Sequence, residues 1–89
     1  RLIDMDVWSS DFTGSDMRGA DFRRVIFVST TLIEVDFEFS TFYDVYFRHS
    51  DLTGANLTAV SLADVTWNDT ICPDGTNSDN NGNTCENNL

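Results

Sequence analysis

Large apolar side chains recur at every fifth position over the first seventy residues. The residue two positions before each later member of this series is small, β-branched or Met. None of these 28 positions is charged, although residues 1–70 hold 17 charged side chains. Exclusion of charge from two positions in every five predicts that both series point inward. The large series is Leu2, Val7, Phe12, Met17, Phe22, Phe27, Leu32, Phe37, Phe42, Phe47, Leu52, Leu57, Leu62 and Trp67, and the second runs in steps of five from Met5 to Thr70.

A period of five fits neither the 3.6-residue period of an α-helix nor the two-residue period of a flat strand. It fits a chain that turns a corner every five residues, so that large and small inward side chains fill a narrow tube. In such a coil, the backbone groups of one turn pair with those of the next. The pattern therefore predicts an all-β solenoid over residues 1–70.

The position just before a large inward residue is often Asp or Asn, as in Asp16, Asp21 and Asn56. Units such as Ala20-Asp21-Phe22-Arg23-Arg24 and Ala55-Asn56-Leu57-Thr58-Ala59 resemble the pentapeptide-repeat family, whose unit is written A(D/N)LXX. The resemblance covers residues 1–70. It implies a right-handed quadrilateral β-helix with four pentapeptides in each coil, so the fourteen units would make about 3.5 coils.

With four units per coil, residues twenty apart stack in columns, one column on each side of the tube. We number these sides as faces, and we expect the phenylalanine rings within a column to stack on one another. The large inward residues are Leu2, Phe22, Phe42 and Leu62 on face one, Val7, Phe27, Phe47 and Trp67 on face two, Phe12, Leu32 and Leu52 on face three, and Met17, Phe37 and Leu57 on face four.

The chain changes character after Thr70. Ile71-Cys72-Pro73 ends the predicted repeat, because Pro has no N–H to continue a ladder. Asn, Asp, Gly, Ser and Thr dominate residues 74–89, which is the composition of turns and loops. We therefore divide the chain into a β-helix at residues 1–70 and a capping tail at residues 71–89.

Cys72 and Cys85 are the only two cysteines, and they bracket the tail. They could be free thiols, but a disulfide is favoured because a polar loop without a core needs a covalent link. Such a link would contribute roughly 3 kcal/mol and would hold the tail as a cap over the end of the coil stack. A disulfide also implies an extracytoplasmic location, whether secreted, periplasmic, on the cell surface or luminal.

The tail also contains an approximate calcium-loop pattern, with candidate oxygen ligands at Asn77, Asp79 and Asn81 followed by Gly82. It departs from that pattern because the first ligand is Asn rather than Asp. The twelfth position is Asn88, where a bidentate Glu is expected. Two readings stay open, a turn-rich capping loop and a weak calcium site, and no other cofactor is expected.

No arrangement in the sequence favours catalysis. His49-Ser50-Asp51 holds three catalytic residue types, but Ser50 occupies an inward position while His49 and Asp51 point outward on either side of a corner. They cannot then form the chain of nucleophile, base and orienting group that a triad requires. We therefore expect a protein that is not an enzyme.

Several outward positions carry apolar or aromatic side chains instead of polar ones. Most of them fall on faces one and two, where together with an arginine they would form a surface typical of protein interfaces. The alternative is that β-branched and aromatic side chains merely suit strands. The candidate interaction surface consists of Trp8, Ile26, Val28, Phe39, Tyr43, Tyr46 and Arg48.

Composition narrows the function further. The net charge is −10 and there is no Lys, which argues against binding to nucleic-acid phosphates. No segment is long and apolar enough to suggest membrane insertion. We expect a non-enzymatic structural or protein–protein interaction module that presents its apolar face to a partner or to another copy. The alternatives are a DNA-mimicking, gyrase-binding protein, which the family resemblance implies as an option, and a weak calcium-binding extracellular module.

Overall fold

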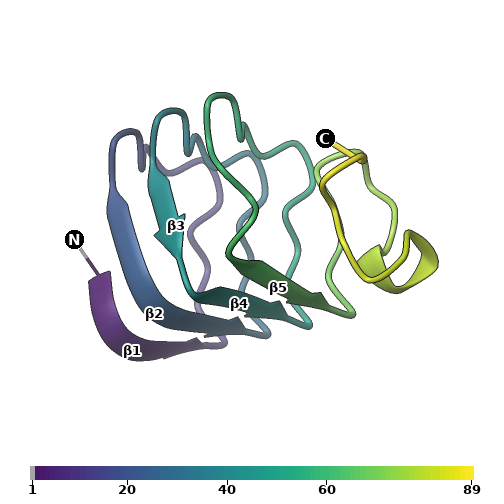
Figure 1. Cartoon of the computed structure of the whole chain (residues 1–89), viewed down its shortest axis with the longest axis horizontal. Coiled ribbons are helices and arrows are strands. Elements are labelled where there is room, and N and C mark those ends of the chain that lie inside the picture. The colour runs from purple at the N-terminus through teal and green to yellow at the C-terminus, as the bar shows by residue number, and fades with distance from the viewer. Residues whose placement is uncertain (1) are drawn as a thin grey trace.

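The computed structural model describes residues 2–89, so residue 1 of the predicted β-helix lies outside the described residues. The chain winds into the stacked coils of a β-solenoid of about three turns, as the repeat predicted (Figure 1). No helix in the described part of the chain has the length and apolar character needed to cross a membrane. The elements are β1 (Leu2–Trp8), β2 (Asp21–Val28), β3 (Thr41–Tyr43), β4 (Val45–Arg48), β5 (Val65–Asn68) and the short 3-10 helix η1 (Ser78–Asn80).

The strands pair in parallel with a shift of twenty residues from one coil to the next. Val7 of β1 pairs with Phe27 of β2, which pairs with Phe47 of β4, which in turn pairs with Trp67 of β5. The sheet runs in the order β1-β2-β4-β5, and β3 pairs with β2 beside this path. The predicted columns of inward residues are therefore correct.

The four faces are of two kinds. Face two is built from strands in each coil and face one in the first three coils, whereas residues 61–64 of face one, like faces three and four, form a turn. In the turns of faces three and four the side chain before the inward residue accepts a hydrogen bond from the backbone N–H two residues later, as Asp11 does from Thr13 at 3.0 Å. The turn then passes through a positive φ, which Gly14 adopts at +73° without steric cost. We call faces three and four the turn side, and faces one and two the sheet side.

The core is a packed column of aromatic and branched side chains. On face two the ring of Phe47 stacks on those of Phe27 and Trp67, with centroids 5.2 and 5.1 Å apart. On face one the prediction of stacked rings is wrong, because Phe22 meets Phe42 edge to face at an interplanar angle of 70°. The Phe37 ring of face four also enters the centre of the tube there, and it makes edge contacts with both phenylalanines.

Buried hydroxyl groups form a second column inside the stack, at positions 30, 50 and 70, and the half-buried Ser10 precedes them in the first coil. The Ser50 hydroxyl lies 3.0 Å from the carbonyl of Arg48 in its own coil and 3.2 Å from that of Phe27 in the preceding coil. Thr70 repeats this arrangement one coil later, at 3.0 Å from the carbonyls of Asn68 and Phe47. The hydroxyls of this column are tolerated inside because the backbone satisfies their hydrogen bonds, whereas the buried Ser40 hydroxyl has no hydrogen-bond partner among the described residues.

The coil runs past the boundary predicted at residue 70. Ile71 pairs with Asp51, and the carbonyl of Pro73 accepts a hydrogen bond from the N–H of Gly54 at 2.9 Å. Proline is compatible with this position because the matching N–H one coil earlier, that of Thr53, bonds to the Asp51 side chain instead of a neighbouring coil. The fully buried Cys72 takes the next inward position on face three.

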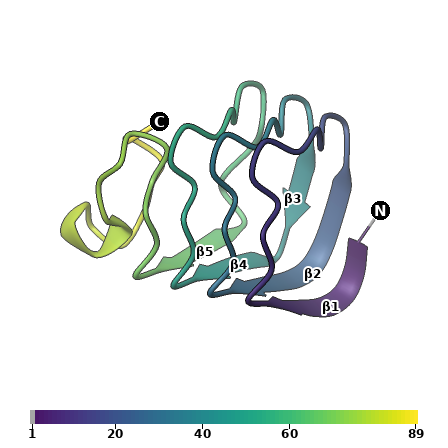
Figure 2. The same cartoon turned by 180° about the vertical axis from the view of Figure 1, so that it is seen from behind.

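The remaining tail folds over the last coil, and the predicted disulfide between Cys72 and Cys85 is present. Both views place this segment against the end of the stack, on the side away from β1 (Figures 1 and 2). Ser78 has no exposed surface; its N–H donates to the carbonyl of Thr70 at 2.8 Å, and its hydroxyl accepts from the N–H of Thr70 at 3.1 Å. Ser50 accepts from the N–H of Thr30 in the same way, so Ser78 occupies the place of the next hydroxyl in the column.

The first coil lacks such a cover among the described residues. Leu2, Phe12 and Met17 are only partly buried, and Met5 is 39% exposed. The sequence pattern predicted that all four point inward and are buried. They belong to the inward series, but a side chain in a terminal coil packs against one neighbouring coil instead of two.

Candidate functional site

The structure divides the predicted interaction residues among three places. Most of them lie on the outer surface of face two, Tyr43 lies on face one, and Phe39 lies at the corner between faces four and one. The face-two group lies on β1, β2 and β4, which form one sheet with β5, and we call the outer surface of these four strands the face-two sheet. Its outward residues are Asp6, Trp8, Ile26, Val28, Tyr46, Arg48, Thr66 and Asn68.

On the face-two sheet the predicted residues differ in exposure. Trp8 is 64% exposed, whereas Ile26 and Tyr46 are half-buried. Val28 was predicted to be exposed but is buried, because it lies between Trp8 and Arg48 in the strand register. The guanidinium carbon of Arg48 lies 5.9 Å from the centre of the Tyr46 ring, which is the geometry of a cation–π contact.

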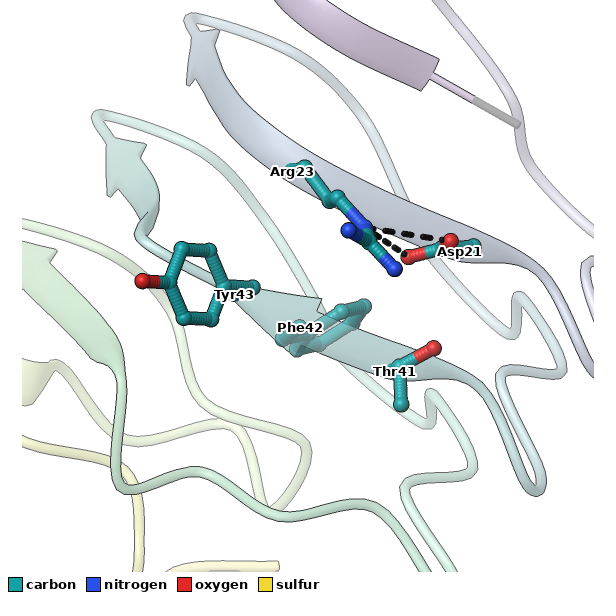
Figure 3. Close-up of a pocket in the computed structure, with 5 residues that line it drawn as sticks. All are labelled: Asp21, Arg23, Thr41, Phe42 and Tyr43. Carbon is teal, nitrogen blue, oxygen red and sulfur yellow. Dashed lines mark hydrogen bonds and ion pairs between the residues drawn. The ribbon is translucent and has the colours of Figure 1, made fainter.

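Face one carries a shallow hollow of about 270 Å³ beside Tyr43 (Figure 3). Its rim comes from Asp21 and Arg23 of β2 and from Thr41 and Tyr43 of β3, while Phe42 lies behind the ribbon. Nε of Arg23 lies 3.2 Å from the Asp21 carboxylate, so the charges on the rim are paired. Sequence analysis predicted only Tyr43 here. The twenty-residue spacing of positions 21 and 41, and of positions 23 and 43, is the signal that joins the others to it.

A second hollow, of about 400 Å³, lies beside Phe39 at the corner between faces four and one. Phe39 is 68% exposed and its backbone has a φ of +61°. Glycine occupies this corner one coil earlier, at Gly19, and alanine one coil later, at Ala59. Among the described non-glycine residues with positive φ, Phe39 is the only large apolar one. The other residues that line the hollow are Asp16, Arg18, Gly19 and Glu38.

Two of the three charges around the Phe39 hollow form an ion pair, whereas Glu38 has no ion-pair partner among the described residues. Arg18 donates to both oxygens of the Asp16 carboxylate at 2.9 Å, and this hydrogen bonding lowers the pKa of Asp16 to about 2. The same contact raises the pKa of Arg18. Both groups therefore stay ionised around neutral pH, and their charges offset one another beside the exposed ring.

The calcium candidates take part in the hydrogen bonding of the cap. The Asn77 side chain accepts from the N–H of Asp79 at 2.8 Å and donates to the Asp69 carboxylate at 2.7 Å. Asp79 accepts from the N–H of Asp69 at 2.9 Å, and the Asn81 amide donates to the Thr76 hydroxyl at 2.8 Å. No cluster of three or more His, Cys, Asp or Glu within residues 2–89 could hold a metal ion.

The catalytic residue types at positions 49–51 point in different directions, as the repeat register predicted. Nδ1 of His49 lies 2.8 Å from the carboxylate of Asp69, one coil later. Ser50 is buried and hydrogen-bonded to backbone carbonyls, while the Asp51 side chain accepts from Thr53. The three side chains therefore do not form a catalytic chain.

The stacked coils and their columns of inward residues define a β-solenoid protein. A family model described as pentapeptide repeats (9 copies) matches residues 8–51, and one described as pentapeptide repeats (8 copies) matches residues 40–66. The chain belongs to the pentapeptide-repeat family, whose members are generally non-enzymatic. A search of curated proteins found no match.

Proposed function

We propose that the protein is a non-enzymatic interaction module that anchors a protein partner through Phe39. The observation that carries this proposal is a large aromatic side chain that is 68% exposed on backbone with a φ of +61°. Its surroundings form a hollow whose rim carries the Asp16–Arg18 ion pair and Glu38, which suits an apolar contact with a polar rim.

Neither packing nor backbone preference accounts for Phe39. The left-handed conformation costs an L-residue about 1–2 kcal/mol, and a bulky residue in it is an outlier. Most of the ring is exposed, so its burial offsets little of this conformational cost. Phe39 is also outside every strand, so the preference of aromatic residues for strands does not apply. That preference does cover Ile26, Val28 and Tyr46, which are weaker evidence for an interface.

The proposed location is extracytoplasmic. The Cys72–Cys85 disulfide supports it, because such bonds persist in oxidising compartments and are rare in the cytosol. Both cysteines are fully buried in the cap and have a structural role there. Detection of the bond in protein isolated from its native compartment, by mass spectrometry after alkylation without reduction, would test the proposal. Alkylation of both cysteines would contradict it.

The Phe39→Gly variant tests the anchor, and Ala59→Gly is its matched control at the same corner of the next coil. Both changes place glycine at a positive φ, so both variants should remain folded and keep or slightly raise the melting temperature. A photoreactive phenylalanine analogue at position 39 should crosslink a discrete partner protein in the native compartment. Competition with unlabelled wild-type or Ala59→Gly protein should abolish that crosslink, and competition with Phe39→Gly should not.

Two outcomes would contradict the proposal. One is a crosslink that Phe39→Gly competes away as well as the wild type does. The other is a probe at position 39 that crosslinks no partner, just as the same probe does at a second exposed site, Thr58.

A DNA-mimicking role, in which the protein binds DNA gyrase, is the second candidate. The turn side supports it, because residues 10–19, 30–39 and 50–59 hold six acids against one Arg. Four of these acids also accept hydrogen bonds that hold their own turns, so the fold accounts for them: Asp11, Asp16, Asp36 and Asp51. A gyrase supercoiling assay separates the candidates, because a DNA mimic should inhibit the enzyme or protect it from quinolones and an extracytoplasmic module should do neither.

A further inference from the structure

We infer that the face-two sheet is a homodimer interface, and that it packs against the face-two sheet of a second copy of this chain. This surface is separate from Phe39, which lies at the corner between faces four and one. The inference goes beyond the proposed function, since a dimer would present two Phe39 anchors in one particle. Two linked anchors would bind a multivalent partner more tightly than one.

The shape of the surface suits a second sheet. Its four strands lie in one parallel sheet, along the lower edge of Figure 1. Trp8 is 64% exposed, and Ile26 and Tyr46 keep part of their surface accessible. Two sheets pack face to face at about 10 Å, with the outward side chains of each interdigitating. The face-two sheet can therefore pack face to face against the same sheet of a second copy.

The charge of this surface favours a copy over a charged partner. The whole chain has a net charge of −10, yet the eight outward residues of the face-two sheet include one acid, Asp6, and one base, Arg48. Contact between the turn sides of two copies would bring acidic surfaces together, whereas contact through this patch pairs two surfaces without net charge.

Arg48 supplies a reciprocal contact. It forms no ion pair within residues 2–89, whereas Arg18, Arg23 and Arg24 each bind a carboxylate. Asp6 likewise has no hydrogen-bond or ion-pair partner among the described residues. In an isologous dimer, any contact from one residue to another occurs twice. An Arg48–Asp6 contact between copies would therefore pair both charges on each surface.

Sedimentation velocity of the oxidised protein from 10 µM to 1 mM tests the inference. The area is small for a specific interface, so we expect a concentration-dependent dimer rather than a permanent one. Trp8→Ser and Arg48→Glu should each weaken dimerisation at least tenfold. Arg18→Glu makes the same charge change on face four and serves as the matched control, with a much smaller effect. The double reversal Asp6→Arg with Arg48→Glu should restore the dimer that each single reversal weakens.

A monomer at every concentration would overturn the inference, and so would a dimer that Trp8→Ser and Arg48→Glu leave intact. If the double reversal does not restore dimerisation, the Arg48–Asp6 contact is contradicted, but the face-two sheet as the interface is not. Phe39→Gly should dimerise normally. If the wild-type protein forms no dimer but still crosslinks a partner at Phe39, this inference alone is contradicted. If the dimer forms but Phe39 crosslinks no partner, the proposed function alone is contradicted.

Discussion

The two ends of the coil stack differ in how far their inward side chains are covered. At the C-terminal end the tail covers the last coil, and Cys72, Ser78 and Cys85 have no exposed surface. At the N-terminal end, inward side chains of the first described coil remain partly exposed, and Met5 shows 39% of its surface. The middle coils are fully packed, with Phe27 and Phe47 both at 0%.

This difference shows what a coil requires from its neighbour. Each coil of a solenoid contacts only the coils beside it, so a terminal coil loses both packing and backbone pairing on one side. The tail replaces these contacts without continuing the repeat. It supplies one hydroxyl through Ser78, one carboxylate through Asp79 and a covalent link at Cys72.

The largest effect should come from comparing an inner coil with the first coil. Phe47→Ala removes a fully buried ring and should lower the free energy of unfolding by about 3–5 kcal/mol. Phe12→Ala should cost less than about half of that, since Phe12 is only partly buried. Urea unfolding followed by circular dichroism gives both values. If Phe47→Ala does not fold, the Phe47→Leu and Phe12→Leu pair makes the same comparison. Equal costs at the two sites would show that the first coil is as well packed as the interior.

The cap comes next. Replacing Cys72 and Cys85 by Ala removes a link across 13 residues and should cost about 3 kcal/mol, mostly by freeing the unfolded chain. Hydrogen exchange should then rise in residues 69–78 and stay unchanged in β1 and β2. Reduction of the wild-type protein should reproduce this pattern. A rise in exchange that is uniform along the chain would mean that the cap and the coils unfold as one unit.

The smallest effect concerns pH, and at the capped end it involves Asp69 and Asp74. Hydrogen bonds from Asn77 and His49 lower the pKa of Asp69, and those from Thr76 lower the pKa of Asp74. A carboxylate with a lowered pKa stabilises the folded state above its ordinary pKa, and this contribution is lost as pH falls through the folded value. The stability of the cap should therefore decline below about pH 4, where these carboxylates become protonated.

The Asp69→Asn and Asp74→Asn variants test this pH effect. They should be less stable than the wild type at pH 7 and should approach it at pH 2, as measured by melting temperature. Asp64→Asn is the control, because the Asp64 side chain forms no hydrogen bond within the described residues. An equal pH dependence in all three variants would contradict the assignment to the cap.

Much of this architecture was readable from the chain. The inward residues and the disulfide followed from spacing and composition, and the twenty-residue columns followed from the four units per coil that the family resemblance implies. Backbone pairing between coils continues as far as Pro73, because this proline sits where the ladder does not use an N–H. Val28 was misassigned as exposed, since its side chain is covered by strand neighbours twenty residues away.

The site residues divide in the same way. The sequence identified Phe39 as one of several outward apolar residues, but only its backbone φ and exposure separate it from those that suit a strand. The hollow beside Tyr43 depends on Asp21, Arg23 and Thr41, which come from two coils and no local motif.

The sequence by itself determined the period, because charge is excluded from two of every five positions, and the period together with the family resemblance indicated the fold. The tertiary structure decided which faces are strands and which are turns, how the cap imitates the next coil, and which exposed aromatic residue the fold does not need. These properties depend on backbone hydrogen bonds and dihedral angles set by neighbouring coils, and the order of residues in one pentapeptide does not specify them.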